Sequence, residues 1–184
     1  MRQLVIVLLF GLAACSAAPG TAQPVPARST GAAGAASPNP CELVTRETLD
    51  SAFPDATAIA PVTADGVEPG NPPANGASGE RDCGYAVTVP GVFGDNPGTD
   101  SASRFTVMVA TYAEDRDGTT WDALSRGTGT RPATNIGDAA FFRGEGDLTA
   151  HRGPVIVHVW SADDVDGVLD DQRVTGIVLR ALAP

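Results

Sequence analysis

Apolar residues divide the chain into three segments. Residues 4–10 form a continuous apolar run, residues 16–38 contain almost no large apolar side chain, and residues 39–184 carry apolar positions at regular spacings. A segment without large apolar residues cannot bury enough surface to fold on its own. We therefore expect one globular domain over residues 39–184, joined by a linker to the apolar N-terminal segment.

A short helical segment opens this domain. Pro40 stands where a helix tolerates proline and begins a turn over residues 40–44. Thr45 is then in position to cap a helix over residues 46–53, which Pro54 ends. The sequence thus predicts a single turn of helix followed by a longer one.

Two further helices are predicted nearer the C-terminus. Thr119 or Thr120 can cap a helix that continues through Ser125. Residues 168–182 place apolar side chains three and four positions apart, which is typical of an amphipathic helix. We expect this last helix to pack its apolar face on the rest of the domain.

Other segments have the composition and alternation of β-strands. The segment of residues 155–160 carries apolar side chains on both faces, which predicts a central strand covered by a helix on at least one face. The Gly-Glu-Gly-Asp sequence at residues 144–147 predicts a β-hairpin turn. Gly- and Pro-rich loops are expected over residues 65–80 and 90–100. The predicted strands are residues 56–63, 83–89, 105–112, 139–143, 148–152 and 155–160.

The N-terminus has the pattern of a bacterial lipoprotein signal. Arg2 precedes the apolar run, and Leu-Ala-Ala at positions 12–14 leads directly to Cys15. The run is too short to span a membrane, which needs about 20 apolar residues. We predict that residues 1–14 are a signal peptide and that two acyl chains on Cys15 anchor the protein to the extracytoplasmic face of the cell membrane. An ordinary signal-peptide cysteine without lipid is the alternative.

The number of cysteines agrees with this location. If Cys15 carries lipid, only Cys41 and Cys83 remain, and an exported domain allows them to form a disulfide. A bridge across this loop would contribute about 4 kcal/mol to stability. Two separately buried thiols are the alternative. A zinc site is less favoured, because neither cysteine has a Cys or His close by in the sequence.

Residues 15–38 are expected to be the lipidated cysteine and a disordered linker rich in Ala, Pro, Gly and Ser. A flexible coil of this length spans about 25–30 Å, and its prolines extend it further. The folded domain should therefore stand away from the membrane surface.

Charge and composition exclude several classes of function. The chain has 12 basic and 22 acidic residues, a formal net charge of −10, so nucleic acid and anionic lipid surfaces are poor partners. All the basic residues are arginine. The absence of lysine excludes a P-loop, a Schiff base and a Ser-x-x-Lys nucleophile.

Several motifs of the chain resemble one family, the domain-of-unknown-function lipoproteins of actinobacteria. The resemblance rests on the lipobox that ends at Cys15, the Pro-Cys-x-Leu sequence of residues 40–43, and Cys83 with Tyr85, where the family often has Cys-x-Trp. A Gly-Asp-Ala-aromatic pattern within residues 137–141 and the closing helix extend it over nearly all of the mature chain. It implies a disulfide between the first helix and a strand, and an antiparallel sheet with helices packed on it. It implies no activity and no catalytic residues.

Pattern and resemblance together predict the fold class. We expect a single α+β domain in which two or three helices pack on an antiparallel β-sheet of about five or six strands, with one disulfide.

Two acidic clusters resemble calcium loops but miss the required positions. In the cluster of residues 163–167 the first and twelfth loop positions are Ala162 and Arg173, where a carboxylate and a Glu are needed. In the cluster of residues 115–118 the same positions are Ala113 and Leu124. We interpret the first cluster as a helix-capping segment and the second as a charged hairpin turn. No metal or cofactor is expected.

The two histidines are the remaining candidates for catalysis. A tight turn near Arg152 would set His151 near Pro154 and His158 near Asp147, so that the histidines would not share a site. A half-buried structural role is favoured for His158 over a role as ligand or base. The aromatic residues Trp121, Phe141, Phe142 and Trp160 are expected in the core, with an apolar ligand pocket as the alternative.

The sequence thus favours a non-enzymatic binding module of the cell envelope, with a protein, a glycan or a small molecule as its partner. The long loops of residues 65–80 and 90–100 are the expected binding surface. A hydrolase that uses His151 or His158 is one alternative, and a carrier of a lipid or another apolar ligand is the other.

Overall fold

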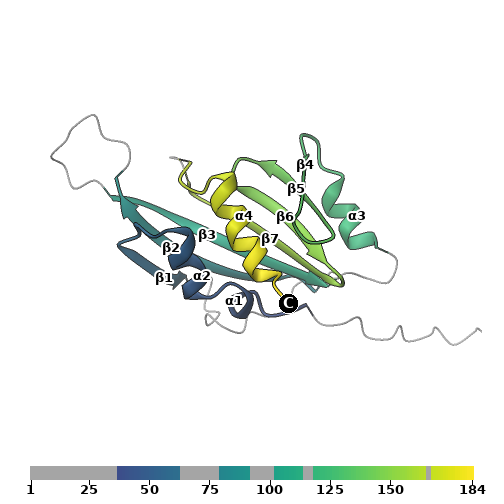
Figure 1. Cartoon of the computed structure of the whole chain (residues 1–184), viewed down its shortest axis with the longest axis horizontal. Helices are drawn as coiled ribbons and strands as arrows, with labels where there is room; N and C mark the ends of the chain where they lie inside the picture. The colour runs from purple at the N-terminus through teal and green to yellow at the C-terminus, as the bar shows by residue number, and fades with distance from the viewer. Residues whose placement is uncertain (1–36, 63–78, 92–101, 114–117, 165–166) are drawn as a thin grey trace, which may run out of the picture. The chain divides into compact units, whose positions relative to one another are not determined.

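The domain is built around one antiparallel sheet (Figure 1). A computed structural model describes residues 37–62, 79–91, 102–113, 118–164 and 167–184, all within one compact unit. The sheet has seven strands in the order β1-β2-β3-β7-β6-β5-β4. They are β1 (Ala58–Val62), β2 (Arg81–Pro90), β3 (Ala102–Ala113), β4 (Arg131–Ala133), β5 (Ala139–Gly144), β6 (Asp147–Arg152) and β7 (Val155–Ser161).

Four helices accompany the sheet: α1 (Pro40–Leu43), α2 (Arg46–Ala52), α3 (Thr119–Ser125) and α4 (Asp171–Ala181). Helices α1, α2 and α4 lie over one face of the sheet, where α4 contacts β6, β7 and α2 (Figure 1). Helix α3 packs through Trp121 and Leu124 on the opposite face. None of the helices in the described part of the chain is long and apolar enough to cross a membrane.

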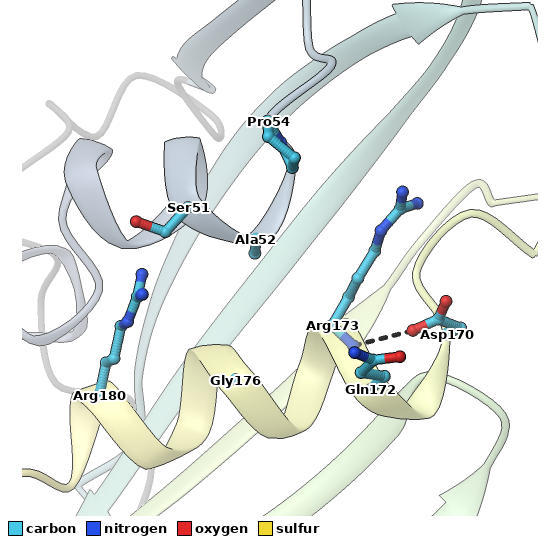
Figure 2. A pocket seen from close by; sticks show the side chains of 8 residues that line it. All are labelled: Ser51, Ala52, Pro54, Asp170, Gln172, Arg173, Gly176 and Arg180. Carbon is cyan, nitrogen blue, oxygen red and sulfur yellow. Dashed lines mark hydrogen bonds between the residues drawn. The ribbon is translucent and has the colours of Figure 1, made fainter.

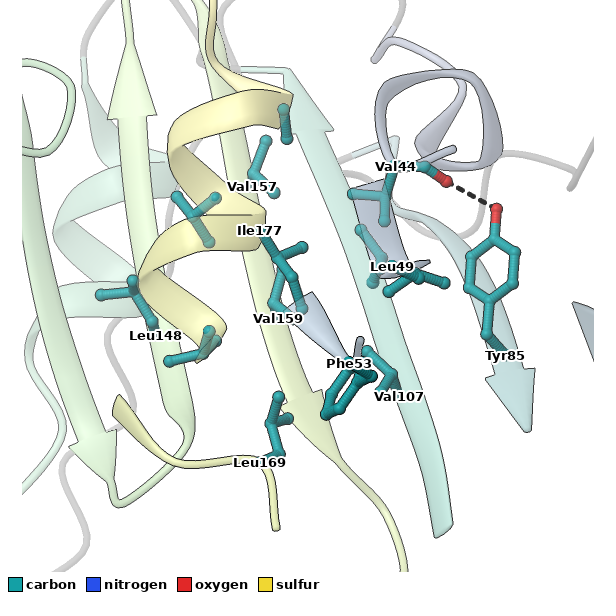
Figure 3. Packing of buried hydrophobic residues seen from close by; sticks show 14 of the residues in the cluster. Val44, Leu49, Phe53, Tyr85, Val107, Leu148, Val157, Val159, Leu169 and Ile177 are labelled. Atoms are coloured by element: carbon teal, nitrogen blue, oxygen red, sulfur yellow. Dashed lines mark hydrogen bonds between the residues drawn. The ribbon is translucent and has the colours of Figure 1, made fainter. Parts of the chain in front are cut away.

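The main core lies between the sheet and helices α1, α2 and α4 (Figure 3). Val157 and Val159 of the central strand are fully buried there and face Ile177 of α4. The ring of Phe53, at the end of α2, meets Phe105 of β3 edge to face with centroids 5.5 Å apart. Side chains of both layers fill this region, as expected for a close-packed interior.

The disulfide, the central strand and the hairpin are confirmed. Cys41 and Cys83 are bonded, with their Cα atoms 5.6 Å apart, and the bond joins α1 to β2. β7 is the central strand, β5 and β6 form the expected hairpin, and Thr45 caps α2 by accepting a hydrogen bond from the Thr48 N–H.

The expected number of strands was too low. The sheet has seven strands, because residues 131–133 add a short edge strand to β5. This strand has only three residues and contains Pro132, so its sequence shows no alternation of apolar and polar residues that would predict a strand. The four helices also exceed the two or three expected.

Two helix starts differ from the prediction. Gly118, in the left-handed conformation, is the N-cap of α3 in place of the predicted Thr119 or Thr120. Helix α4 begins at Asp171, because Asp170 is its N-cap and accepts a hydrogen bond from the Arg173 N–H. The residues just before α4 form a separate turn that Asp164 holds by accepting from the N–H groups of Val168 and Leu169.

Candidate functional site

The face of the sheet opposite α1, α2 and α4 carries a row of mostly polar side chains. The strand register places Asp82, Ala110, His158, Thr149 and Phe141 opposite one another on β2, β3, β7, β6 and β5. Directly opposed residues of antiparallel strands project to the same side of a sheet. The row therefore brings a carboxylate, an imidazole and a hydroxyl onto one surface.

His158 is held in place on two sides. Its Nε2 atom is 2.8 Å from Oδ1 of Asp147, which begins β6, and its ring stacks on Trp160 with centroids 4.3 Å apart. The histidine is 7% exposed, and the Asp147 side chain is 30% exposed. A ring fixed by a carboxylate and an aromatic face keeps one orientation, so His158 forms part of a preorganised surface.

Thr149 is the hydroxyl closest to His158 in the register. It lies directly opposite His158, is fully buried, and its Oγ1 has no hydrogen-bond partner within the described residues. A nucleophile must reach its substrate, and a fully buried hydroxyl does not. The His158–Asp147 pair therefore supplies an imidazole and a carboxylate, but the hydroxyl group of the neighbouring Thr149 is inaccessible.

The β2 side of this surface is acidic. Tyr112 donates a 2.7 Å hydrogen bond to Glu80, and burial together with this carboxylate raises the pKa of the tyrosine. Burial is also the main cause that raises the pKa of Asp82, and the charge of Glu80 adds to it, while His158 acts in the opposite direction. These groups give this part of the sheet surface a negative potential.

A hollow of about 450 Å³ lies at the β5–β6 turn. Trp160 and Asp147 line it from the strands, Glu145 lines it from the turn, and Asp164 and Leu169 line it from the segment before α4. The Asp164 carboxylate is occupied by backbone N–H groups and the Asp147 carboxylate by His158, whereas Glu145 is exposed. The hollow combines one indole ring with carboxylate oxygens that can accept hydrogen bonds.

The second histidine lies on the same face in a different environment. His151 pairs with Ile156, and its ring is 4.4 Å from that of Trp121 in α3. The register is two residues away from the predicted one, because the turn between β6 and β7 is formed by Gly153 and Pro154 and pairs Arg152 with Val155. The predicted pairing of His151 with Pro154 was wrong, whereas the proximity of His158 to Asp147 is confirmed through their side chains.

The aromatic residues divide between core and surface. Phe141 and Phe142 are buried, as expected for core residues. Trp121 and Trp160 are only partly buried, and both pack beside the small cluster of Ala110, Tyr112 and Ile156.

Several predicted features lie outside the described residues. These are Cys15, the linker up to residue 36, and most of the two long loops, of which only residues 79–80 and 90–91 are described. Most of the acidic cluster at residues 115–118 also lies outside. Within the described part of the chain, no group of three or more His, Cys, Asp or Glu side chains is placed to hold a metal ion.

Comparisons with known proteins add no family to this description. No family model, no curated protein and no solved structure matches the chain.

Proposed function

We propose that this protein is an exported, lipid-anchored module of the cell envelope that binds a glycan in the hollow at the β5–β6 turn and does not transform it. The observation that carries the proposal is the position of Trp160, whose ring is held against His158 at the edge of a hollow lined by carboxylates. A sugar ring presents an apolar C–H face and several hydroxyl donors. An indole can pack against the apolar face, and the exposed carboxylate of Glu145 can accept hydrogen bonds from the hydroxyl groups.

The lipobox at Cys15 and the Cys41–Cys83 disulfide support the envelope location. Disulfides persist in oxidising compartments outside the cytoplasm. The acidic net charge and the acidic sheet surface disfavour nucleic acid and anionic membrane as ligands, which leaves the membrane contact to the acyl chains on Cys15.

The absence of turnover is proposed because the His158–Asp147 pair lacks an accessible nucleophile beside it. The hydroxyl opposite His158 belongs to Thr149, which is fully buried. A binding role uses the same preorganised surface without requiring this hydroxyl to reach a substrate.

Calorimetric titration tests the binding site. Full-length protein in a non-ionic detergent is titrated with soluble oligomers of N-acetylglucosamine and of glucose. We expect one series to bind, and we expect Trp160→Ala to weaken binding about tenfold or more, because the ring supplies the apolar contact. Trp121→Phe is the matched control, because Trp121 packs against Phe141 and His151 and does not line the hollow. Equal binding by wild type and Trp160→Ala would refute this site.

Two further measurements test the remaining parts of the proposal. Cys15→Ala is expected to release the protein into the medium, and retention after a carbonate wash would contradict lipidation at this position. A screen with esterase, peptidase and glycosidase substrates is expected to show no turnover. Activity that is lost in His158→Ala or His151→Ala would establish the hydrolase alternative instead.

A further inference from the structure

A second hollow lies between α2 and α4, on the face of the sheet covered by helices (Figure 2). Its volume is about 460 Å³, within the range of sites that hold small molecules. Ser51, Ala52 and Pro54 form one wall at the end of α2, and the exposed side of α4 forms the other. Unlike the main core, this groove is open to solvent and lined by polar and apolar groups in about equal measure.

Two arginines of α4 project across this groove. Arg173 and Arg180 are seven residues apart, which is two turns, so they lie on the same side of the helix with about 10.5 Å between their Cα atoms. Figure 2 shows both side chains rising from α4 toward α2, one at each end of the groove. The groove therefore carries two positive charges in a chain whose net charge is −10.

Arg180 retains most of its hydrogen-bonding capacity. Its guanidinium makes one hydrogen bond at 3.5 Å, to the backbone oxygen of Thr48. Among the described residues, no carboxylate lies within salt-bridge distance of it. A guanidinium has five donors in a planar fork, so four of them remain for an oxyanion.

Arg173 is fixed in position by its neighbours. It donates a 2.7 Å hydrogen bond to the carbonyl oxygen of Val168, and its guanidinium lies 5.3 Å from the centre of the Phe53 ring. Among the described residues its one carboxylate contact is a long one, 3.8 Å to the exposed Asp55. Arg173 is thus held at the groove by contacts that leave donors free, and a bound oxyanion competes only with a loose ion pair.

Gly176 lies midway between the two arginines on the same side of α4. Glycine is the least favourable residue of a helix interior after proline. A Cβ atom at this position would meet nothing within 4 Å, so neither packing nor a turn requires glycine here. The missing side chain keeps the floor of the groove open between the two guanidinium groups.

The acidic residue that lines the groove has a separate role. Asp170 accepts the hydrogen bond of the Arg173 N–H and caps α4. Asp50, nearby on α2, is paired with Arg46 at 2.8 Å. Because Asp170 and Asp50 are bonded elsewhere, neither carboxylate pairs with the guanidinium groups of Arg173 and Arg180.

We propose that the groove between α2 and α4 binds an elongated organic dianion, with a carboxylate or phosphate group at each end held by Arg173 and Arg180 and its middle lying over Gly176. This site is separate from the hollow beside Trp160 and does not depend on the function proposed for it.

Calorimetric titration of the full-length protein in a non-ionic detergent tests the inference. The probes are suberate and hexane-1,6-diol bisphosphate, whose ends distinguish a carboxylate from a phosphate ligand, and octanoate, which has a single charged end. We expect at least one dianion to bind about tenfold more tightly than octanoate, because it engages both guanidinium groups.

Three variants locate the site. Arg180→Gln is expected to weaken dianion binding about tenfold and to reduce it to the level of octanoate. Gly176→Leu, which fills the floor, is expected to abolish binding while the protein stays folded, because the position faces open space. Asp55→Asn is expected to strengthen binding, since it removes the carboxylate that lies 3.8 Å from Arg173 and competes for its guanidinium.

Arg126→Gln is the matched control, because it removes the same charge from an exposed side chain at the C-terminal end of α3. No dianion binding at about 10 mM ligand, equal binding of octanoate and the dianions, or equal loss in Arg126→Gln and Arg180→Gln would overturn the proposal. Thermal unfolding of each variant separates loss of binding from loss of fold.

Discussion

The Tyr85 hydroxyl donates a 2.7 Å hydrogen bond to the carbonyl oxygen of Val44, the residue that follows α1 (Figure 3). Val44 is fully buried, and Tyr85 is 7% exposed. The same hydroxyl lies 3.4 Å from the carbonyl oxygen of Cys41, so it contacts one carbonyl group within α1 and one directly after it. Tyr85 and the Cys41–Cys83 disulfide thus attach α1 to β2 at neighbouring positions of the strand.

Tyr85→Phe should lower the free energy of unfolding by about 1–2 kcal/mol. The substitution keeps the buried ring but leaves the Val44 carbonyl group without its donor in the interior, which costs the desolvation of that group. Urea unfolding of both proteins measures the difference. An unchanged midpoint would show that another donor serves this carbonyl.

Reduction of the Cys41–Cys83 disulfide should lower the free energy of unfolding by about 4 kcal/mol, because the open chain gains conformational freedom when it unfolds. Intact mass before and after reduction should differ by two hydrogen atoms, and the melting temperature should fall. Free alkylation of both cysteines in unfolded, non-reduced protein would contradict the bond.

Gly146→Ala should destabilise the domain by about 2–4 kcal/mol. Gly146 has a φ of +67°, and a Cβ atom there would collide with the backbone oxygen of Leu169 in the segment before α4. Its N–H also donates to Asp171 of α4 at 3.1 Å, so the turn cannot move away without losing this bond.

Gly153→Ala is the matched control for this prediction. Gly153 also has a positive φ, +53°, but a Cβ atom would meet nothing within 4 Å. Only the backbone strain remains, so the loss should be about 1–2 kcal/mol. An equal decrease in the free energy of unfolding in the two variants would show that the Leu169 backbone can move away from the new Cβ atom at little cost.

Asp82→Asn should stabilise the protein modestly, by about 0.5 kcal/mol at neutral pH, because solvent screens a carboxylate that is only partly buried. Burial and Glu80 raise the pKa of Asp82 above its usual 3.8, so the folded protein disfavours the charged form. The contribution of Asp82 to the free energy of unfolding is therefore most favourable below the pKa that the residue has in the unfolded chain. It is lost as the pH rises through the higher pKa of the folded protein.

The advantage of Asp82→Asn should accordingly disappear at about pH 3, where the carboxyl group is protonated in both states. Urea unfolding at the two pH values provides the comparison. A stabilisation that persists in acid would assign the effect to packing instead of charge.

Helix caps and tight turns could be predicted from the sequence, because they depend on residues only a few positions apart. Thr45 caps α2 as predicted, because an N-cap needs only its own side chain and an N–H three residues later. The β5–β6 hairpin followed from its turn residues. Strand β4 was missed, because a three-residue edge strand is defined by its partner β5 and has no pattern of its own.

The candidate site depended more on tertiary context. Alternation in β7 indicated that His158 and Trp160 share a face, but the row with Asp82 and Thr149 required the register across several strands. That register is set by the turn at Gly153 and Pro154, and moving a two-residue turn by one position shifts the pairing by two residues. The predicted helix of residues 168–182 contains Arg173 and Arg180, but no pattern in the sequence indicated that α2 forms a wall opposite them.

The disulfide also determines how the domain would carry tension. Cys41 and Cys83 are 42 residues apart in sequence, and the segment between them contains α2 and β1. A pull on the chain from its N-terminal side passes at Cys41 directly through the covalent bond into β2 and the sheet. The intervening segment then bears no load, whereas in the reduced protein the same force would first peel α1 and α2 from the core.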